Sequence, residues 1–165
     1  MAEVHTAFVS VGSNLGDKLE NCQRGVASLT RHGCEVIAQS GIYRTEPVDY
    51  LDQDWFVNYV IQIETRLEPL QLLDAIQKIQ LESGRGPDKI RFGPRILDLD
   101  IIFYDTITIN TSQLIIPHPR MHKRRFVLQP LCDIDPTLIH PVLNVGMLSL
   151  LQALDDDEQR IHPYR

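Results

Sequence analysis

An alternating segment near the middle of the chain restricts the fold most strongly. Residues 93–102 read Gly-Pro-Arg-Ile-Leu-Asp-Leu-Asp-Ile-Ile. Successive side chains of a β-strand point to opposite faces, so Asp98 and Asp100 share one face, roughly 6–7 Å apart along the strand. Leu97, Leu99 and Ile101 take the other face and can be buried. The pattern predicts a strand that covers a hydrophobic core on one side and presents two carboxylates on the other.

Two carboxylates at this spacing suit a pair of Mg²⁺ ions, which lie roughly 3.5–4 Å apart in two-metal sites. Arg95, three residues before the first aspartate, provides a planar fork of donors that fits phosphate oxygens. The alternative is an edge strand whose polar face simply contacts water. An Asp-x-Asp pattern taken alone favours that alternative, because a short motif is only a hypothesis.

The segment directly upstream is basic, although the chain as a whole is acidic. Residues 85–95 contain four cations, Arg85, Lys89, Arg91 and Arg95, and one anion, whereas the whole chain has a formal net charge of −6. A cationic segment beside two carboxylates favours a site where metal ions and a polyphosphate meet. A solvent-exposed loop with scattered charge is the alternative that the local sequence leaves open.

Three further segments accompany the Gly-Pro-Arg-x-Leu-Asp-Leu-Asp motif. They are residues 11–17, residues 43–48 with 56–58, and residues 116–121 with Arg124 and 126–128. In order and spacing, the four segments resemble the 6-hydroxymethyl-7,8-dihydropterin pyrophosphokinase family of folate enzymes, over roughly residues 4 to 145. One short motif can arise by chance, whereas four in register are specific.

The resemblance implies both a fold and a reaction. The implied fold is α+β, with a ferredoxin-like βαββαβ core, one antiparallel sheet, helices packed on it, and a hairpin and C-terminal extension. The implied enzyme transfers diphosphate from MgATP to the hydroxymethyl group of 6-hydroxymethyl-7,8-dihydropterin. The products are AMP and the pterin diphosphate, and two Mg²⁺ ions are the expected cofactors, with ATP as co-substrate.

The resemblance also assigns roles to individual residues. The expected catalytic residues, of which the two aspartates are also the metal ligands, are Arg91, Arg95, Asp98 and Asp100. The expected pterin pocket consists of Thr45, Pro47, Val48, Phe56, Asn58, Phe92 and Phe126. The residues expected to bind ATP are Gln77, Arg85, Arg91, Arg95, Ile101, Ile115, His118 and Arg124.

Several of these residues have a plainer interpretation when the resemblance is set aside. Phe126 reads as part of the core, Asn58 as a side chain bonded to nearby backbone, and His118 as a surface histidine. Residues 12–17 are predicted to form a turn that leads into the first helix, because they lack the Lys-Ser/Thr ending of a phosphate-binding P-loop.

Three positions depart from the family pattern. The family usually has Glu where this chain has Gln80, a basic residue where it has Pro87, and sometimes Trp where it has Phe92. We expect Gln80 to keep an acceptor for ribose hydroxyls, because an amide carries both an acceptor and donors. The alternative is that the family's acid orients Arg85 or Arg91 through a charge-assisted bond, in which case glutamine leaves that arginine less firmly held.

Composition limits the class of protein. The 165 residues predict one domain, 1–165, and a hydrophobic content of 43% with 23% charged residues is ordinary for a soluble protein. No apolar run reaches the ~20 residues of a membrane helix, and no signal peptide is evident. Three cysteines without metal-ligand spacing predict free thiols in a reducing compartment. The negative charge argues against binding to nucleic acid or membranes. The free thiols predict a cytoplasmic location, and we also expect a monomer.

Hydrophobic periodicity predicts the order of the elements. Strands are expected at residues 6–11, 35–43, 55–64 and 96–104, with helices at 17–30 and from Pro69 to Gly84. A hairpin extension is expected at 106–110, and short helical turns follow, with a helix at 148–154. This order describes an α+β sandwich with one antiparallel sheet.

Two other functions are compatible with parts of the sequence. A ferredoxin-like module could bind a nucleotide without catalysis, although the intact Arg95, Asp98 and Asp100 argue against it. A metal-dependent nuclease could use the same carboxylates, but the acidic charge and the lack of a basic stripe argue against nucleic acid.

Overall fold

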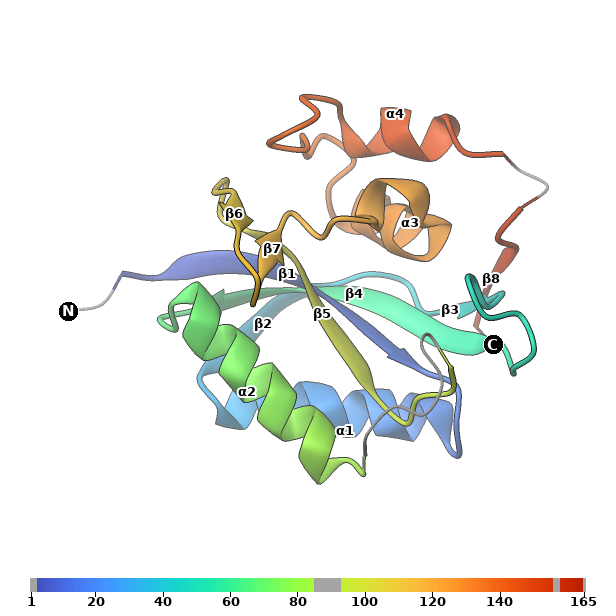
Figure 1. The fold of residues 1–165 in the computed structure, drawn as a ribbon, viewed down its shortest axis with the longest axis horizontal. Coiled ribbons are helices and arrows are strands. Elements are labelled where there is room, and N and C mark those ends of the chain that lie inside the picture. The colour runs from blue at the N-terminus through green and yellow to red at the C-terminus, as the bar shows by residue number, and fades with distance from the viewer. Residues whose placement is uncertain (1–2, 85–92, 156–157, 165) are drawn as a thin grey trace.

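A six-stranded antiparallel sheet lies at the centre of the molecule (Figure 1). The computed structural model describes residues 3–84, 93–155 and 158–164. The strands follow the order β5-β1-β4-β3-β8. Strands β3 and β2 both pair with the same edge of β4, β3 near its start and β2 near its end. The bounds of the strands are β1 (His5–Ser13), β2 (Cys34–Gln39), β3 (Tyr43–Thr45), β4 (Phe56–Thr65), β5 (Asp98–Tyr104) and β8 (Ile161–Pro163).

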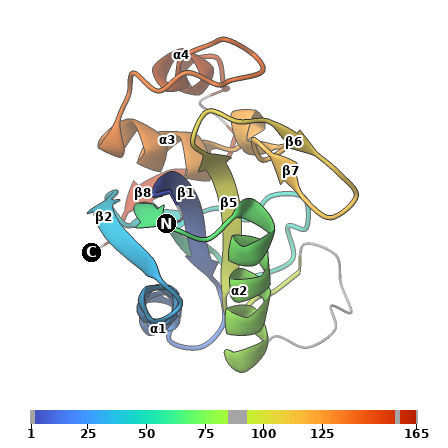
Figure 2. The ribbon, with the colours of Figure 1, turned by 90° about the vertical axis from the view of Figure 1, so that its left-hand side faces the viewer.

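Two helices connect these strands in the predicted βαββαβ order and cover one face of the sheet (Figure 2). Helix α1 (Lys18–Arg31) begins after Asp17, whose carboxylate accepts a hydrogen bond from the Glu20 N–H. Helix α2 (Pro69–Glu82) has proline in its first turn, where no backbone donor is lost. The ferredoxin-like core expected from the sequence is confirmed.

The core between the sheet and these helices follows the strand alternation. Val9 and Val11 of β1, and Leu99 of β5, point toward the helices and are at most 3% exposed. Burial of such side chains contributes about 1.5–3 kcal/mol each. The expected division of the 93–102 segment into an apolar and a polar face is therefore confirmed.

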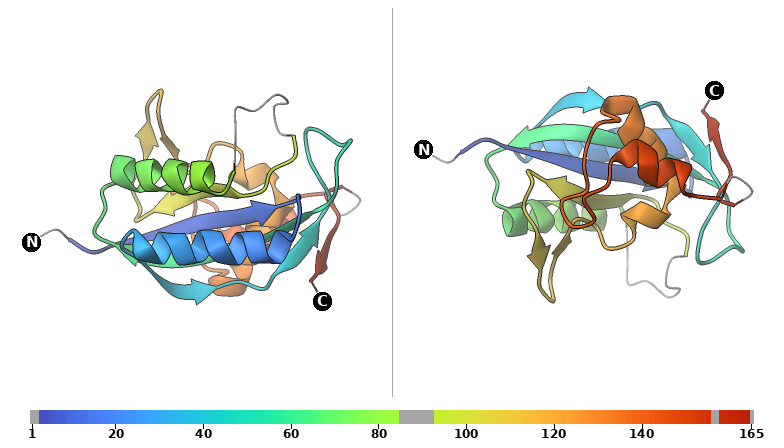
Figure 3. Two further views of the ribbon diagram at one scale, coloured as in Figure 1. Left: turned by 90° about the horizontal axis from the view of Figure 1, so that it is seen from below. Right: turned by 90° about the horizontal axis from the view of Figure 1, so that it is seen from above.

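A second helical layer covers the opposite face of the sheet (Figures 1 and 3). It contains α3 (Arg125–Ile134) and α4 (Met147–Gln152), and a 3-10 turn (Met121–Lys123) precedes it. Short helical turns were expected here, and for α3 that expectation is wrong. The helix has only ten residues and contains Pro130, so its own propensity is weak; burial against the sheet stabilises it.

The prediction of one continuous strand at 35–43 is also wrong, because the region forms two strands, β2 and β3, with an interruption between them. Ser40 exchanges hydrogen bonds with Val60 through both its backbone N–H and its hydroxyl oxygen. The next backbone N–H, that of Gly41, turns away and donates to the Asp133 carboxylate of α3. The strand ends here because the Ser40 hydroxyl takes the place of a backbone acceptor and the Gly41 N–H bonds to α3 instead of β4.

The hairpin extension is confirmed, with its second strand further along the chain. Strand β6 (Ile109–Asn110) pairs with β7 (Ile115–Ile116) in a separate two-stranded sheet. Strand β5 begins at Asp98 rather than Ile96, and the C-terminal strand β8, which pairs with β3, was not anticipated.

The cysteines behave as the sequence predicts. All three are free thiols, and Cys22 and Cys34 are buried. Burial raises the pKa of the Cys22 thiol to about 12, so this side chain packs as a small apolar group. Within the described ranges, no helix is long and apolar enough to cross a bilayer.

Leu128→Ala tests whether the layer built on α3 is a true core. Leu128 is fully buried beneath this layer, so we expect the variant to lose about 2–5 kcal/mol of unfolding free energy in chemical denaturation. Leu148→Ala in α4 is the matched control, because that side chain is 45% exposed. Similar losses for the two variants would contradict the assigned core.

Candidate active site

Three neighbouring strands place the polar residues of the site in one row across the sheet. Gly12 of β1 pairs with Asn58 of β4 on one side and with Asp98 of β5 on the other. Adjacent strands lie about 4.8 Å apart, so Asn58 and Asp98 flank a gap of roughly 10 Å above the glycine. The row lies at one end of the sheet, on the face toward α3.

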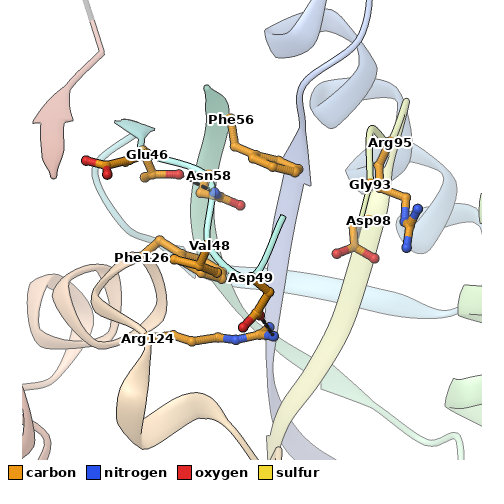
Figure 4. Close-up of a pocket in the computed structure, with 11 residues that line it drawn as sticks. Glu46, Val48, Asp49, Phe56, Asn58, Gly93, Arg95, Asp98, Arg124 and Phe126 are labelled. Atoms are coloured by element: carbon orange, nitrogen blue, oxygen red, sulfur yellow. Dashed lines mark hydrogen bonds and ion pairs between the residues drawn. The ribbon is translucent and has the colours of Figure 1, made fainter. Parts of the chain in front are cut away.

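A cavity lies over this row, and Figure 4 shows the side chains that surround it. Five of the seven residues predicted for the pterin pocket line it: Thr45, Val48, Phe56, Asn58 and Phe126. Pro47 is buried beside the cavity without lining it, and Phe92 lies outside the described residues. The remaining lining residues are Glu46, Asp49, Gly93, Arg95, Asp98 and Arg124.

The Asn58 side chain is held in one orientation. It is 5% exposed, and its Nδ2 donates to Oγ1 of Thr45 at 2.6 Å. A Cβ atom on Gly12 would lie 2.3 Å from Oδ1 of Asn58, closer than any real contact allows. The absent side chain at position 12 therefore lets the amide lie over β1, and it leaves the space between Asn58 and Asp98 open.

Sequence reasoning missed this role, because residues 12–17 were interpreted as a turn. Gly12 and Ser13 belong to β1, and the turn begins only after them. A glycine inside an apolar strand signals a close approach of another group, and this signal was available in the sequence.

Arg124 carries a buried positive charge to the same cavity. Its side chain is 13% exposed, with Nη2 3.5 Å from Oδ2 of Asp49, and its Cζ lies 5.4 Å from the centre of the Phe126 ring. Burial lowers the pKa of the guanidinium, while the carboxylates of Asp100 and Asp49 oppose that shift. Arg124 was predicted to bind ATP, and the structure places it beside the residues predicted to bind the pterin.

A second cavity lies on the other side of the carboxylate pair, between β5, α2 and the hairpin. It contains three of the residues predicted to bind ATP, Ile101, Ile115 and His118, together with Asp100. Gln77 is exposed on α2 and does not line this cavity, and Arg85 and Arg91 lie outside the described residues. Asp98 thus lines the first cavity and Asp100 the second.

His118 is a neutral side chain in this setting. Burial, with a smaller contribution from Arg124, lowers the pKa of its imidazole to about 4. Its Nδ1 accepts a hydrogen bond from the Arg120 N–H at 3.1 Å, so the ring proton lies on Nε2. His118 is therefore a fixed hydrogen-bond donor rather than the surface histidine that its isolated sequence suggests.

Asn14 holds the segment that carries Arg95. The Arg95 N–H donates to Oδ1 of Asn14 at 2.7 Å, and the Asn14 N–H donates to the Arg95 carbonyl at 2.9 Å. The same amide donates from Nδ2 to Gln53 and to the Asp54 carbonyl. This buried asparagine thus links β1 to the two segments that border the first cavity, a role that the sequence analysis did not assign.

Gln80 has a partner that the sequence analysis did not foresee. It is 8% exposed, and its Oε1 accepts a hydrogen bond from the Leu99 N–H at 2.8 Å. This oxygen was expected to accept hydrogen bonds from ribose hydroxyls, but it accepts one from the backbone N–H between Asp98 and Asp100. Pro87, the other departure from the family pattern in this region, lies outside the described residues.

The carboxylate pair has the composition that Mg²⁺ requires. Magnesium in phosphoryl-transfer sites is bound through one or two carboxylates, with substrate phosphates and water as the other ligands. Asp98 and Asp100 are half-buried on one face of a strand, each at a cavity. Across residues 3–84, 93–155 and 158–164, no group of three or more His, Cys, Asp or Glu could hold a metal alone.

Comparison with known proteins identifies the family. Residues 8–136 match the model of 7,8-dihydro-6-hydroxymethylpterin-pyrophosphokinase. The chain belongs to this family. It is 44% identical over 129 residues to the 2-amino-4-hydroxy-6-hydroxymethyldihydropteridine pyrophosphokinase of Bacillus subtilis, covering 78% of this chain and 77% of that protein.

Other relatives of the pyrophosphokinase family are much longer. The folic acid synthesis protein fol1 of Pneumocystis carinii is 39% identical over 158 residues, 95% of this chain but only 21% of its own length. The crystal structure of wild-type HPPK-DHPS from Plasmodium falciparum has a TM-score of 0.73 and 17% identity, covering 92% of this chain and 45% of that one. The latter comparison supports the fold.

Gly12→Ala tests the close approach across the central row. The new methyl group would displace the Asn58 amide, so we expect pterin affinity to fall at least about tenfold, or 1.4 kcal/mol. Calorimetric titration with the pterin in the presence of a non-hydrolysable ATP analogue measures this. The control is Ala27→Gly, which exchanges the same two residue types at an exposed position of α1 and does not touch the row. Gly33→Ala is unsuitable as a control, because Gly33 has a positive φ. Unchanged pterin affinity in Gly12→Ala would contradict the assigned geometry.

The lowered pKa of His118 predicts a pH dependence of stability. The unfolded imidazole takes up a proton near pH 6.5, but the folded one does so only near pH 4. Stability is therefore lost as pH falls from 6.5 to 4, by up to about 3 kcal/mol. His118→Asn keeps an acceptor for the Arg120 N–H and cannot titrate. In metal-free denaturation series, wild type should lose more stability than this variant; parallel curves would refute the assignment.

Proposed function

We propose that the first cavity binds the reduced pterin and the second binds ATP. As a member of the pyrophosphokinase family, the protein transfers diphosphate from ATP to 6-hydroxymethyl-7,8-dihydropterin in folate synthesis, with AMP as the other product. The observation that supports the assignment of the cavities is the position of the two aspartates. Asp98 lines one cavity and Asp100 the other, so one strand borders both substrates.

The pterin cavity offers the contacts that a flat, polar heterocycle needs. Phe56 and Phe126 supply aromatic surface from β4 and α3, which favours stacking on a planar ring. Asn58, held by Thr45, supplies fixed polar atoms for the ring edge. A buried amide that is already oriented loses little entropy when a ligand binds.

The ATP cavity combines apolar and polar surface. Ile101, Ile115 and Leu73 offer an apolar floor for a purine base, and His118 offers its Nε2–H as a donor. Gln77, Arg85 and Arg91 stay predictions, since Gln77 does not line the cavity and the two arginines lie outside the described residues.

The reaction transfers a diphosphoryl group in line between the two cavities. The pterin hydroxyl oxygen attacks the β-phosphorus, and the bond between that phosphorus and the oxygen that leaves with AMP breaks. Negative charge then develops on the phosphoryl oxygens, where Arg95, held by its backbone to Asn14, can donate hydrogen bonds. Asp98 and Asp100 would hold Mg²⁺, which neutralises the phosphate charge when bound.

The other expectations from the sequence stay predictions. They are the single domain over 1–165, the monomeric state, the cytoplasmic location, the two-ion count, and the lack of nucleic-acid or membrane binding. Size-exclusion chromatography with light scattering would test the monomer directly.

Asp98→Asn and Asp100→Asn test the carboxylate pair and the proposed function together. Each variant keeps the side-chain shape but removes a negative charge, so we expect AMP formation from ATP and the pterin to fall by at least about 10². Asp74→Asn on α2 is the control, because its carboxylate is 63% exposed and forms an i,i+4 ion pair with Lys78 on the same helix. Circular dichroism checks that each variant is folded.

Two outcomes would contradict the proposal. Near wild-type AMP formation in either variant would exclude a metal-binding role for that aspartate. Failure of the wild-type protein to form AMP would instead favour a module that binds nucleotide without catalysis.

A further inference from the structure

We propose that Gln159 and Arg160 act as positioning residues that set the width of the pterin cavity by tying its two walls together. The inference rests on the proposed function, because it takes the first cavity to be the pterin site. Both residues lie beyond the 8–136 region that matches the family model.

The cavity has two walls that come from distant parts of the chain. One wall is formed by Thr45 and Glu46, at and just after the end of β3. The facing wall is formed by Arg124 and Phe126, at the start of α3 (Figure 4). β3 belongs to the sheet, whereas α3 packs on it as a separate layer. The Tyr43 hydroxyl of β3 and the Gly41 N–H donate to Asp133 near the end of α3, so the separation at the start of the helix depends on other contacts.

Gln159 binds the α3 wall through both ends of its amide. Its Oε1 accepts a hydrogen bond from the Arg125 N–H at 2.8 Å, and its Nε2 donates to the Lys123 carbonyl at 2.8 Å. These two backbone groups flank Arg124. The Arg125 N–H is one of the first donors of α3, which would otherwise lack an intrahelical partner, so the glutamine caps the helix from a distance.

Arg160, the next residue, binds the opposite wall. Its carbonyl accepts from the Glu46 N–H at 2.9 Å, and its Nε donates to Oε2 of Glu46 at 2.7 Å. The Glu46 carboxylate also accepts from the Arg160 N–H at 3.2 Å, and this pairing lowers the pKa of Glu46. Strand β8 then continues the contact, with Ile161 opposite Thr45.

The segment that follows anchors this dipeptide firmly. His162 stacks on Trp55 with ring centres 5.8 Å apart and an interplanar angle of 6°. The guanidinium carbons of Arg44 and Arg160 lie 5.3 and 5.2 Å from the Trp55 ring centre. Trp55 directly precedes Phe56 of the cavity, so β8 is fixed to the segment that carries one of the aromatic walls.

The consequence is that two adjacent residues link the segments that form the two walls of the cavity. Consecutive Cα atoms are about 3.8 Å apart, so a peptide unit leaves little freedom in the distance between the groups it links. Loss of either set of hydrogen bonds would let the start of α3 shift relative to β3. Pterin binding would be affected, whereas none of the described residues that line the ATP cavity between β5, α2 and the hairpin takes part in this contact.

Gln159→Asn is the most informative variant. Gln159 has φ +55°, a left-handed conformation that asparagine adopts more readily than most residues, so the backbone is not strained by the change. The amide remains, but the side chain is one methylene too short to bond Arg125 and Lys123 together. Arg160→Ala removes the side-chain part of the opposite contact, the bond from Nε to Glu46, and Arg160→Lys keeps its charge. Glu158→Ala, at an exposed neighbouring position, is the control.

For Gln159→Asn and Arg160→Ala, we expect the KM for the pterin to rise at least about fivefold, while the KM for ATP changes less than about twofold. Arg160→Lys should recover part of the loss, and Glu158→Ala should match wild type. A pterin bearing an added methyl group at C7 provides a second measure. The preference for the natural pterin over this bulkier analogue, as a ratio of kcat/KM values, should narrow severalfold when the walls can separate.

Equal rises in both KM values, or a lowered Tm with unchanged kinetics and unchanged preference, would overturn the proposal by showing a merely structural role. Failure of the proposed function is distinguishable, because it would be seen in the wild-type protein as the absence of AMP. In that case pterin affinity, measured by calorimetry, still decides the inference: equal affinity in wild type and Gln159→Asn would refute it.

Discussion

The pairing of β1 with both β4 and β5 is the constraint on which the site depends. It brings Gly12, Asn58 and Asp98, which lie 46 and 40 positions apart in chain order, into one row with Gly12 in the middle. The hydrogen bonds of an antiparallel ladder define this register, and a slip by one residue would turn each of these side chains to the opposite face. The apolar residues of the same strands would then face the first cavity. Burial of one face of the sheet therefore also determines where the polar groups of the other face lie.

The parts of the structure that were predictable have a strong and local sequence signal. The alternation around Asp98 and Asp100 indicates a strand with a polar face, and the order of helical and strand patterns indicates the ferredoxin-like core. The cap at Asp17 is a direct consequence of its side chain. The resemblance to the pyrophosphokinase family added the residues of the pterin cavity, of which Pro47 does not line the cavity and Phe92 lies outside the described residues.

The parts that were missed depend on contacts between distant segments. Helix α3 is short and contains Pro130, and it is stabilised by a sheet face whose orientation is not visible from residues 125–134 alone. The break at Ser40 and Gly41 depends on Asp133 of that same helix. The environment of Arg124, Gln80 and Asn14 likewise comes from partners far along the chain, and no periodicity within a window of residues could reveal it.

Strand β5 lies at an edge of the main sheet, and the bond between Gln80 and the Leu99 N–H has a consequence for association between molecules. An exposed edge with free backbone donors can pair with a strand from a second molecule and so begin aggregation. Here the donor between the two aspartates is already occupied by a side chain from α2, and two negative charges flank it. The part of this edge from Asp98 to Asp100, which would have to stay accessible to substrates in the proposed function, is thus poorly suited to pair with a strand from another molecule.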